Sequence, residues 1–191
     1  MGFIGSLTLT AMLVSLVWVL LPVYTNYNFQ MPESQYGFIP TTNAVMVVTL
    51  QYLVTRLIKR RDPMTMMTLG TLLSAVGTVM VAFFSGFWGF WLCMVVITFG
   101  ELVLVPTATT FTANMAPVEM RGRYMSMYWL TSNVGSTIAP VLGGYLSDSY
   151  GGRYIWYGGG VIGVLAVAAF LILTVKVKRS TQQSANQLHH P

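Results

Sequence analysis

Six long apolar runs, separated by short polar segments, make up nearly the whole chain. A helix needs about 20 mostly apolar residues to cross the roughly 30 Å hydrocarbon core of a bilayer. The runs meet that length, so the pattern predicts six membrane-spanning helices, over residues 3–24, 36–57, 64–84, 88–115, 124–147 and 154–177. They would form one transmembrane domain over residues 1–179. The tail at 180–191 is polar and aperiodic, which predicts disorder.

The composition excludes a water-soluble domain. Of the 191 residues, 54% are hydrophobic and only 8% are charged, and the mean hydropathy is +0.64. A soluble domain usually carries roughly 25% charged residues. This chain has too few charges to cover a soluble surface, so we expect an integral membrane protein in contact with the lipid bilayer.

The basic residues predict the orientation in the membrane. Six spans place both termini on one side, and nine of the ten Lys and Arg residues fall on that side; only Arg153 falls on the other. Positive charge in short loops marks the cytoplasmic face. We therefore expect a multi-pass protein of the inner (plasma) membrane with both termini cytoplasmic. The net charge of +5 is then a topology signal, and nucleic acid is not an expected partner.

No pattern for catalysis or metal binding is visible. The single cysteine, Cys93, lies inside an apolar run, and the two histidines, His189 and His190, lie in the polar tail. The motifs of nucleotide loops, zinc proteases and serine hydrolases do not occur. We expect no enzyme activity, no cofactor and no metal site.

Glu101 is the acidic residue that stands out, because it interrupts the apolar run "ITFGELVLVPTA". It lies about 20 Å into its span, at a depth where an ionised carboxylate costs about 3 kcal/mol or more. Hydrocarbon favours the protonated carboxyl, and access to water favours its ionised form. A proton-coupling role is one interpretation. The other is a protonated side chain that hydrogen-bonds a neighbouring helix.

Other side chains could line a substrate cavity between the helices. The second span is the most polar, which favours a cavity-lining position over a lipid-facing one. Amides offer neutral hydrogen bonds, and aromatic rings offer flat apolar faces, although rings also serve as anchors at the membrane interface. The candidates are Asn43, Gln51 and Asn133 among the amides, and Tyr24, Tyr27 and Trp129 among the aromatic residues. Pro106 removes one backbone hydrogen bond and marks either a hinge or a static kink.

The sequence contains a weak internal repeat. The turn after the fifth span reads G-x-L-x-D-x-x-G-x-R, with Gly144, Asp148, Gly151 and Arg153 at the named positions. The turn after the second span keeps a leucine and basic residues but not the glycines or the aspartate. The second and fifth spans each carry an asparagine, Asn43 and Asn133. Two units of three spans would have opposite orientations in the membrane, as in the inverted 3+3 repeats of one transporter class.

Four stretches together resemble the carboxy-terminal six-helix half of a major facilitator superfamily transporter, most closely the proton-coupled multidrug efflux members. They are "LPVYTNYNF", "GELVLVP", the loop "APVEMRGRYMS" with Arg121 and Gly122, and the turn signature at 144–153. The resemblance covers nearly all of residues 1–179. It implies an all-α fold that is one half of a twelve-helix carrier. Thr55 and Arg56 depart from the signature expected of the cytoplasmic loop.

The resemblance implies secondary transport, with protons and a small lipophilic or cationic molecule as partners and efflux as the direction. Two alternatives stay open. The chain, whose first span begins almost at Met1, could be cut from a longer protein or need an amino-terminal half or a second copy. It could also be a membrane protein that binds other proteins and transports nothing. The residues themselves identify neither the substrate nor the coupling ion.

Overall fold

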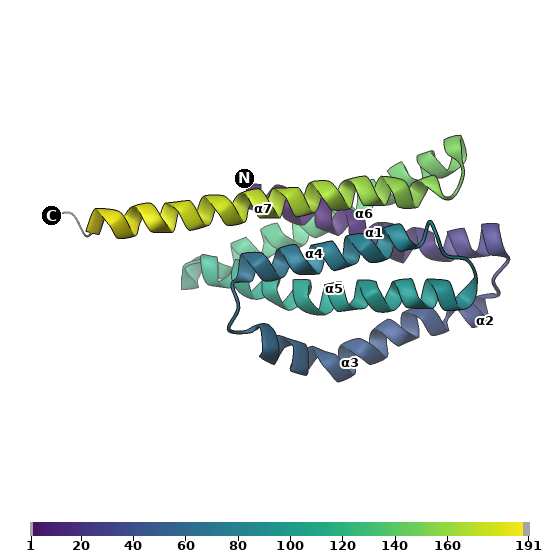
Figure 1. Ribbon diagram of the computed structural model, residues 1–191, viewed down its shortest axis with the longest axis horizontal. Helices are drawn as coiled ribbons and strands as arrows, with labels where there is room; N and C mark the ends of the chain where they lie inside the picture. Colours follow the sequence, from purple (N-terminus) through teal and green to yellow (C-terminus); the bar gives the residue numbers. More distant parts are fainter. Residues whose placement is uncertain (1, 189–191) are drawn as a thin grey trace.

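The fold is all-α. The computed structural model describes the backbone of residues 2–188 and the side chains of residues 2–176. Six long helices are joined by short connections, with one short helix and one 3-10 turn between them (Figure 1). In chain order these elements are α1 (Gly2–Phe29), α2 (Glu33–Tyr36), α3 (Phe38–Ile58), α4 (Pro63–Met80), α5 (Gly86–Met115), η1 (Val118–Met120), α6 (Arg121–Tyr150) and α7 (Tyr154–Leu188).

Five segments of the described chain are long and apolar enough to cross a membrane by length and composition: α1, Glu33–Ile58, α4, α5 and Tyr154–Lys176. The sixth long helix, α6, is 30 residues long, the same as α5. It carries glycine, serine and asparagine along much of its length, which lowers its hydropathy. A polar helix of this length suits a position next to a cavity better than one facing lipid.

Local signals explain several helix ends. The carboxylate of Asp62 caps α4 by accepting a hydrogen bond from the Thr65 amide at 2.9 Å, and Pro63 occupies the first turn, where its missing N–H costs nothing. At the other end of the bundle α6 stops at Gly151, whose φ of +105° favours glycine. The Gly151 amide donates to the Ser147 carbonyl at 2.9 Å and closes this turn.

The packing of the helices repeats with opposite orientation. The three-helix units are α1, α3, α4 and α5, α6, α7. In this comparison α1 corresponds to α5, α3 to α6, and α4 to α7. The contact between α1 and α6 then corresponds to the contact between α5 and α3. In the same way, the contact between α4 and α5 corresponds to the contact between α7 and α1. The contact between α4 and α7 is its own counterpart, because these two helices correspond to each other. Corresponding helices run in opposite directions (Figure 1), so the arrangement is an inverted 3+3 repeat.

One end of the bundle carries most of the basic side chains. The ends of α3 and α5 and the starts of α4 and α6 lie at the same end as the two chain termini, on the left in Figure 1. Arg56, Lys59, Arg60 and Arg61 at the end of α3, and Arg121 and Arg123 at the start of α6, are all exposed there. Arg153 is exposed at the opposite end. The helix order therefore gathers the predicted clusters into one basic end.

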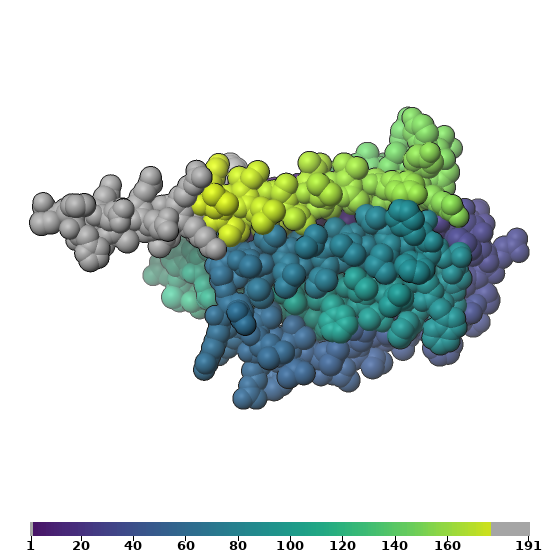
Figure 2. Space-filling view, in the orientation of Figure 1, coloured from purple at the N-terminus to yellow at the C-terminus, as the bar shows by residue number. Residues whose placement is uncertain are grey.

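Small residues bring α4 and α5 close together. A Cβ atom placed on Gly70 would lie 2.9 Å from the Gly100 carbonyl oxygen, and one on Gly77 would lie 3.1 Å from the Ile97 nitrogen. Such short distances mean that the two backbones nearly touch. In Figure 2, α7, α4, α5 and α3 cover one face from top to bottom.

The last helix extends further than the composition predicts. α7 continues to Leu188, whereas the polar sequence after residue 180 predicts disorder. Alanine, leucine and glutamine are good helix formers, and a continuing helix satisfies its own backbone hydrogen bonds. The last part of that predicted tail, residues 189–191, lies outside the described residues.

Candidate functional site

Glu101 lies midway along α5 and joins three helices. The indole Nε1–H of Trp18 on α1 donates to one carboxyl oxygen at 2.9 Å. The amide Nδ2 of Asn43 on α3 donates to the other carboxyl oxygen at 2.8 Å. Both partners are donors at these atoms, so the arrangement suits an ionised carboxylate. Glu101 is half-buried and therefore faces the space shared by these helices.

A second bond orients Asn43. Its Nδ2 also donates to the Thr98 hydroxyl at 2.9 Å, and this hydroxyl in turn donates to the Met94 carbonyl at 2.7 Å. Because the hydroxyl proton of Thr98 is already committed, its oxygen is an acceptor for Asn43. Asn43 is 7% exposed and Thr98 is fully buried. The position of the amide next to Glu101 is thus set by α5 itself.

A groove of about 400 Å³ runs between α1, α5 and α6 next to this network. Small-molecule sites usually have a volume of this order. Two of the predicted cavity residues, Trp129 and Asn133, line it from α6, and Trp18 lines it from α1. Ser15, Ser132 and Ser136 add hydroxyl groups, while Val14, Val105 and Ala108 make most of the remaining wall apolar. The groove therefore offers aromatic faces together with uncharged hydrogen-bonding groups.

Gln51 lies on α3, away from this groove. Its Nε2 donates to the Leu102 carbonyl of α5 at 3.3 Å and to the Thr55 hydroxyl at 3.0 Å. At the opposite end of α3, the Trp91 indole donates to the Thr42 hydroxyl at 2.9 Å. Together with Asn43, these contacts tie α3 to α5 at three residues, of which Thr42 and Asn43 are consecutive. The structure thus places Gln51 between helices.

The two tyrosines and the turn signature lie together at the end opposite the basic end. Tyr24 is 3% exposed and packs edge-on against Phe29, Phe90 and Trp156. Tyr27 is 82% exposed. A hollow of about 550 Å³ between α1, α6 and α7 is lined by both tyrosines and by Gly144 and Asp148. Gly151 forms the turn, and Arg153 is exposed beside it. The structure separates this group from Glu101 along the bundle.

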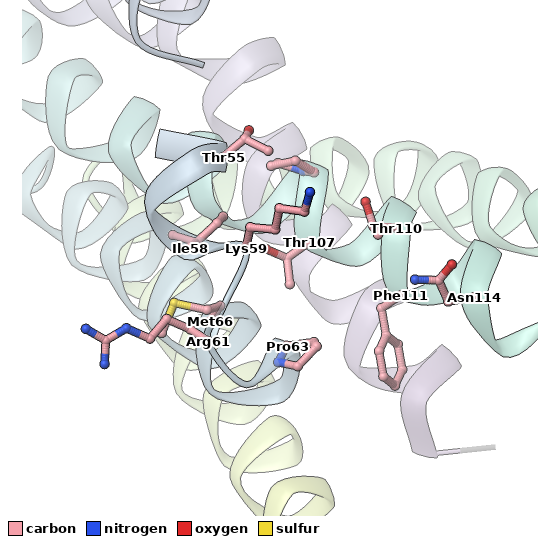
Figure 3. Close-up of a pocket in the computed structure, with 11 residues that line it drawn as sticks. Thr55, Ile58, Lys59, Arg61, Pro63, Met66, Thr107, Thr110, Phe111 and Asn114 are labelled. Carbon is pink, nitrogen blue, oxygen red and sulfur yellow. The ribbon is translucent and has the colours of Figure 1, made fainter. Parts of the chain in front are cut away.

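Pro106 lies inside α5, five residues after Glu101. It lines a smaller hollow of about 150 Å³ at the basic end, between α3, α4 and α5 (Figure 3). Lys59 extends over this hollow toward Thr110, and Arg61 points away from it (Figure 3). Arg121 and Gly122 begin α6 at the same end, and both are exposed. The hinge role of Pro106 stays a prediction.

Trp18 is the residue of the site that sequence reasoning missed. It stands in an apolar run, "VSLVWVLLP", where a tryptophan can equally face lipid. No neighbouring polar residue marks it, because its partner Glu101 is 83 positions away in the chain. The only indication in the sequence was Glu101, since a carboxylate inside a helix bundle requires hydrogen-bond donors from other helices.

Among the described residues, no group of three or more His, Cys, Asp or Glu side chains is placed to hold a metal ion. The fold and the interior acid define a multi-pass α-helical membrane protein whose polar network lies between helices. This class includes carriers with inverted repeats and a site near the bilayer midplane.

The chain belongs to the Major Facilitator Superfamily, whose sequence model matches residues 3–191. It is 30% identical over 135 residues to an uncharacterised MFS-type transporter of Escherichia coli, YdeE. The matched region covers 69% of this chain and 32% of that protein. It is 29% identical over 109 residues to a Na⁺, Li⁺, K⁺/H⁺ antiporter of Planococcus maritimus, covering 57% of this chain and 26% of that protein. The chain thus spans about a third of the length of such relatives.

A solved structure supports the same fold. The chain superposes with a TM-score of 0.71 on a bacterial homologue of the human lysosomal transporter Spinster in an inward-facing, unoccupied conformation. The match covers 91% of this chain and 41% of that one, at 16% identity. The likeness shows the fold.

Proposed function

We propose that this chain acts as a secondary carrier that moves a small lipophilic or cationic molecule across the membrane in exchange for protons. Glu101 is the proton-coupling residue. The observation that carries the proposal is the pair of hydrogen bonds from Trp18 and Asn43, which tie one interior carboxylate to two other helices. A change in its protonation changes contacts on α1, α3 and α5 together.

The chemistry follows from the number of donors. An ionised Glu101 accepts charge-assisted bonds from Trp18 and Asn43, which are roughly twice as strong as bonds between neutral groups. A protonated Glu101 gains a hydrogen of its own and accepts more weakly. Proton binding therefore loosens the ties between the helices. This is how a local proton event biases the equilibrium between two arrangements of a carrier.

The groove next to Glu101 supports the choice of substrate class. Its aromatic faces suit flat apolar molecules and also cations, which the ring faces attract. The carboxylate adds attraction for positive charge. The antiporter of Planococcus maritimus, which its name connects with protons and monovalent cations, is compatible with cation–proton exchange.

The test uses the chain reconstituted in lipid vesicles with an imposed proton gradient. Uptake of a fluorescent lipophilic cation, ethidium, is followed in the parent chain and in Glu101→Gln. We expect gradient-driven uptake to be at least about tenfold lower in the Gln variant, because the amide does not ionise and so cannot carry a proton as the carboxyl group does. Glu119→Gln, which changes an exposed acid in η1, is the matched control and should behave like the parent. Gradient-driven uptake that survives in Glu101→Gln would refute the coupling role.

A second candidate is a half-carrier that works after pairing with another six-helix unit. It is favoured by the finding that the chain spans 32% and 38% of the lengths of two of its relatives. Under this proposal an amino-terminal half or a second copy completes the cavity. If the second unit is an amino-terminal half, parent vesicles would transport only when that half is reconstituted with the chain. Transport by vesicles that each hold a single copy of the chain would contradict this candidate.

A further inference from the structure

We propose that Trp18 connects the groove with the proton site, so that an aromatic ligand stacked on this indole drives Glu101 to release its proton. The inference rests on the proposed function. It adds a positioning residue and the chemical class of ligand, a planar aromatic compound. The proton moves from the Glu101 carboxyl to water, and no other bond is made or broken.

Trp18 belongs to two sites at the same time. Its ring is 40% exposed and forms part of the groove wall. Its Nε1–H donates to Glu101 at 2.9 Å. One indole thus presents an apolar face to a ligand while its edge holds the carboxylate. A ligand that stacks on the Trp18 ring in this orientation holds the side chain in the conformation in which its N–H bonds Glu101.

The direction of the coupling follows from the bond. The indole N–H is a donor only, and its bond is stronger to a carboxylate than to a neutral carboxyl. Holding Trp18 in place therefore stabilises the ionised form of Glu101. By reciprocity, ligand and proton oppose each other. Such opposition is what exchange of a substrate for a proton requires.

The groove wall supports aromatic ligands in particular. Trp129 is 59% exposed on α6 and lines the groove opposite α1 together with Tyr128. Two indoles and a phenol around a space of about 400 Å³ provide stacking surfaces for a flat ring system. The hydroxyl groups of Ser132 and Ser136 lie on the same wall and can bond a polar substituent.

Other ionisable groups near α5 do not account for such a response. α4 carries none between Pro63 and Met80. The remaining ones on α5 and on the helices around it are Cys93 on α5, Tyr24 and Tyr27 on α1, Tyr52 and Arg56 on α3, and Arg121, Arg123, Tyr124, Tyr128, Tyr145, Asp148 and Tyr150 on α6. Of these, Tyr128 alone lines the groove, and phenols ordinarily ionise near pH 10. Glu101 is the carboxyl group bonded to the groove wall through Trp18, so we assign the response to it.

The experiment measures binding of 9-anthracenemethanol to the full chain in detergent by fluorescence between pH 5 and 9. This probe is planar and has no charge, so direct attraction to the carboxylate does not contribute. In the parent chain we expect the affinity to fall at least about fivefold as pH decreases. In Trp18→Phe, which keeps a ring but loses the N–H donor, the affinity should vary less than about twofold. A pH dependence in Trp18→Phe equal to that of the parent would overturn the inference.

Two further variants separate the possible failures. Trp91→Phe removes another indole bond between helices, the one to Thr42, and should keep the pH dependence of the parent. Glu101→Gln should bind the probe equally at every pH. A pH dependence that persists in Glu101→Gln would refute the proposed function itself. A dependence lost in Glu101→Gln but kept in Trp18→Phe would refute only the role of Trp18.

A measurement on the unmodified chain does not depend on any variant folding. Adding 9-anthracenemethanol in weakly buffered solution should release protons, up to about one per bound probe near the midpoint of the pH dependence. Release of protons supports the coupling. Saturable binding without proton release, or no saturable binding, overturns it.

Discussion

Asn43 contributes two contacts with one amide group, and a substitution removes both. Its Nδ2 bonds Glu101 at 2.8 Å and Thr98 at 2.9 Å. Asn43 is nearly inaccessible at 7% exposure, so water cannot replace these bonds easily. Leucine has a similar size but offers no donor to either partner.

We therefore expect Asn43→Leu to lower the free energy of unfolding by about 1–2 kcal/mol, the usual range for a hydrogen bond to a charged group moderated by the smaller values found in membranes. Thermal unfolding in detergent, followed by circular dichroism, measures this change. Asn133→Leu, an exposed position on α6, is the control and should stay within about 0.5 kcal/mol of the parent. Equal losses in both variants would contradict the special role of Asn43.

The site could be predicted in part from the sequence. A lone carboxylate inside an apolar run is visible without any structure, so Glu101 was an evident candidate. Asn43 was also a candidate, for the cavity, but its bond to Glu101 and the role of Trp18 were not evident, because these residues lie 58 and 83 positions away from Glu101 in the chain. Which tryptophan faces an acid depends on the rotation of each helix, and the apolar sequence around Trp18 leaves that rotation open.

At the scale of elements, close contact between α4 and α5 depends on glycine. A Cβ placed on Gly100 would contact the Ser74 hydroxyl and lie 2.6 Å from the Gly70 carbonyl oxygen. The backbone carbonyl cannot move aside without shifting the helix. Gly144 on α6 differs, since a Cβ there would meet nothing within 4 Å.

Gly100→Ala is expected to separate α4 from α5 and to cost about 1–3 kcal/mol, as overpacking of a close contact usually does. Gly144→Ala should leave stability unchanged or raise it slightly, because alanine is the better helix former. Unfolding midpoints of the two variants provide the comparison. The same midpoint for Gly100→Ala as for the parent would show that these helices can move apart at no cost.

The element boundaries show what periodicity determines and what it does not. Four of the six apolar runs lie within long helices, because a helix in lipid must satisfy its own backbone bonds, while the run at 36–57 begins two residues before α3. The run at 64–84 ends earlier as a helix, at Met80, and the next helix begins at Gly86, whose φ is +77°. Hydropathy could not reveal that α6 packs closely along α1. This packing depends on Gly135, where an added Cβ would lie only 2.7 Å from the Thr8 carbonyl oxygen of α1.

At the scale of the whole molecule, the charge distribution leads to a topology proposal. The basic end of the bundle carries Lys59 and Arg121, and the opposite end carries Arg153. Basic loops remain on the cytoplasmic side. We propose that both chain termini are cytoplasmic.

Cysteine labelling in intact cells tests this orientation. The lone Cys93 is fully buried and is replaced by alanine to give a background without thiols. Lys59→Cys should react with a membrane-impermeant maleimide only after the cells are opened, whereas Arg153→Cys should react in intact cells. The opposite labelling pattern would invert the proposed orientation.

The attachment of α3 has a mechanical consequence. Among the long helices it packs mainly on α5, and side-chain bonds at Thr42, Asn43 and Gln51 tie it there. If a force microscope pulled on the α2–α3 segment, this helix would detach first and with small steps, since each tie breaks separately. The middle tie breaks at the acid itself, so the force at that step would depend on the pH of the bath.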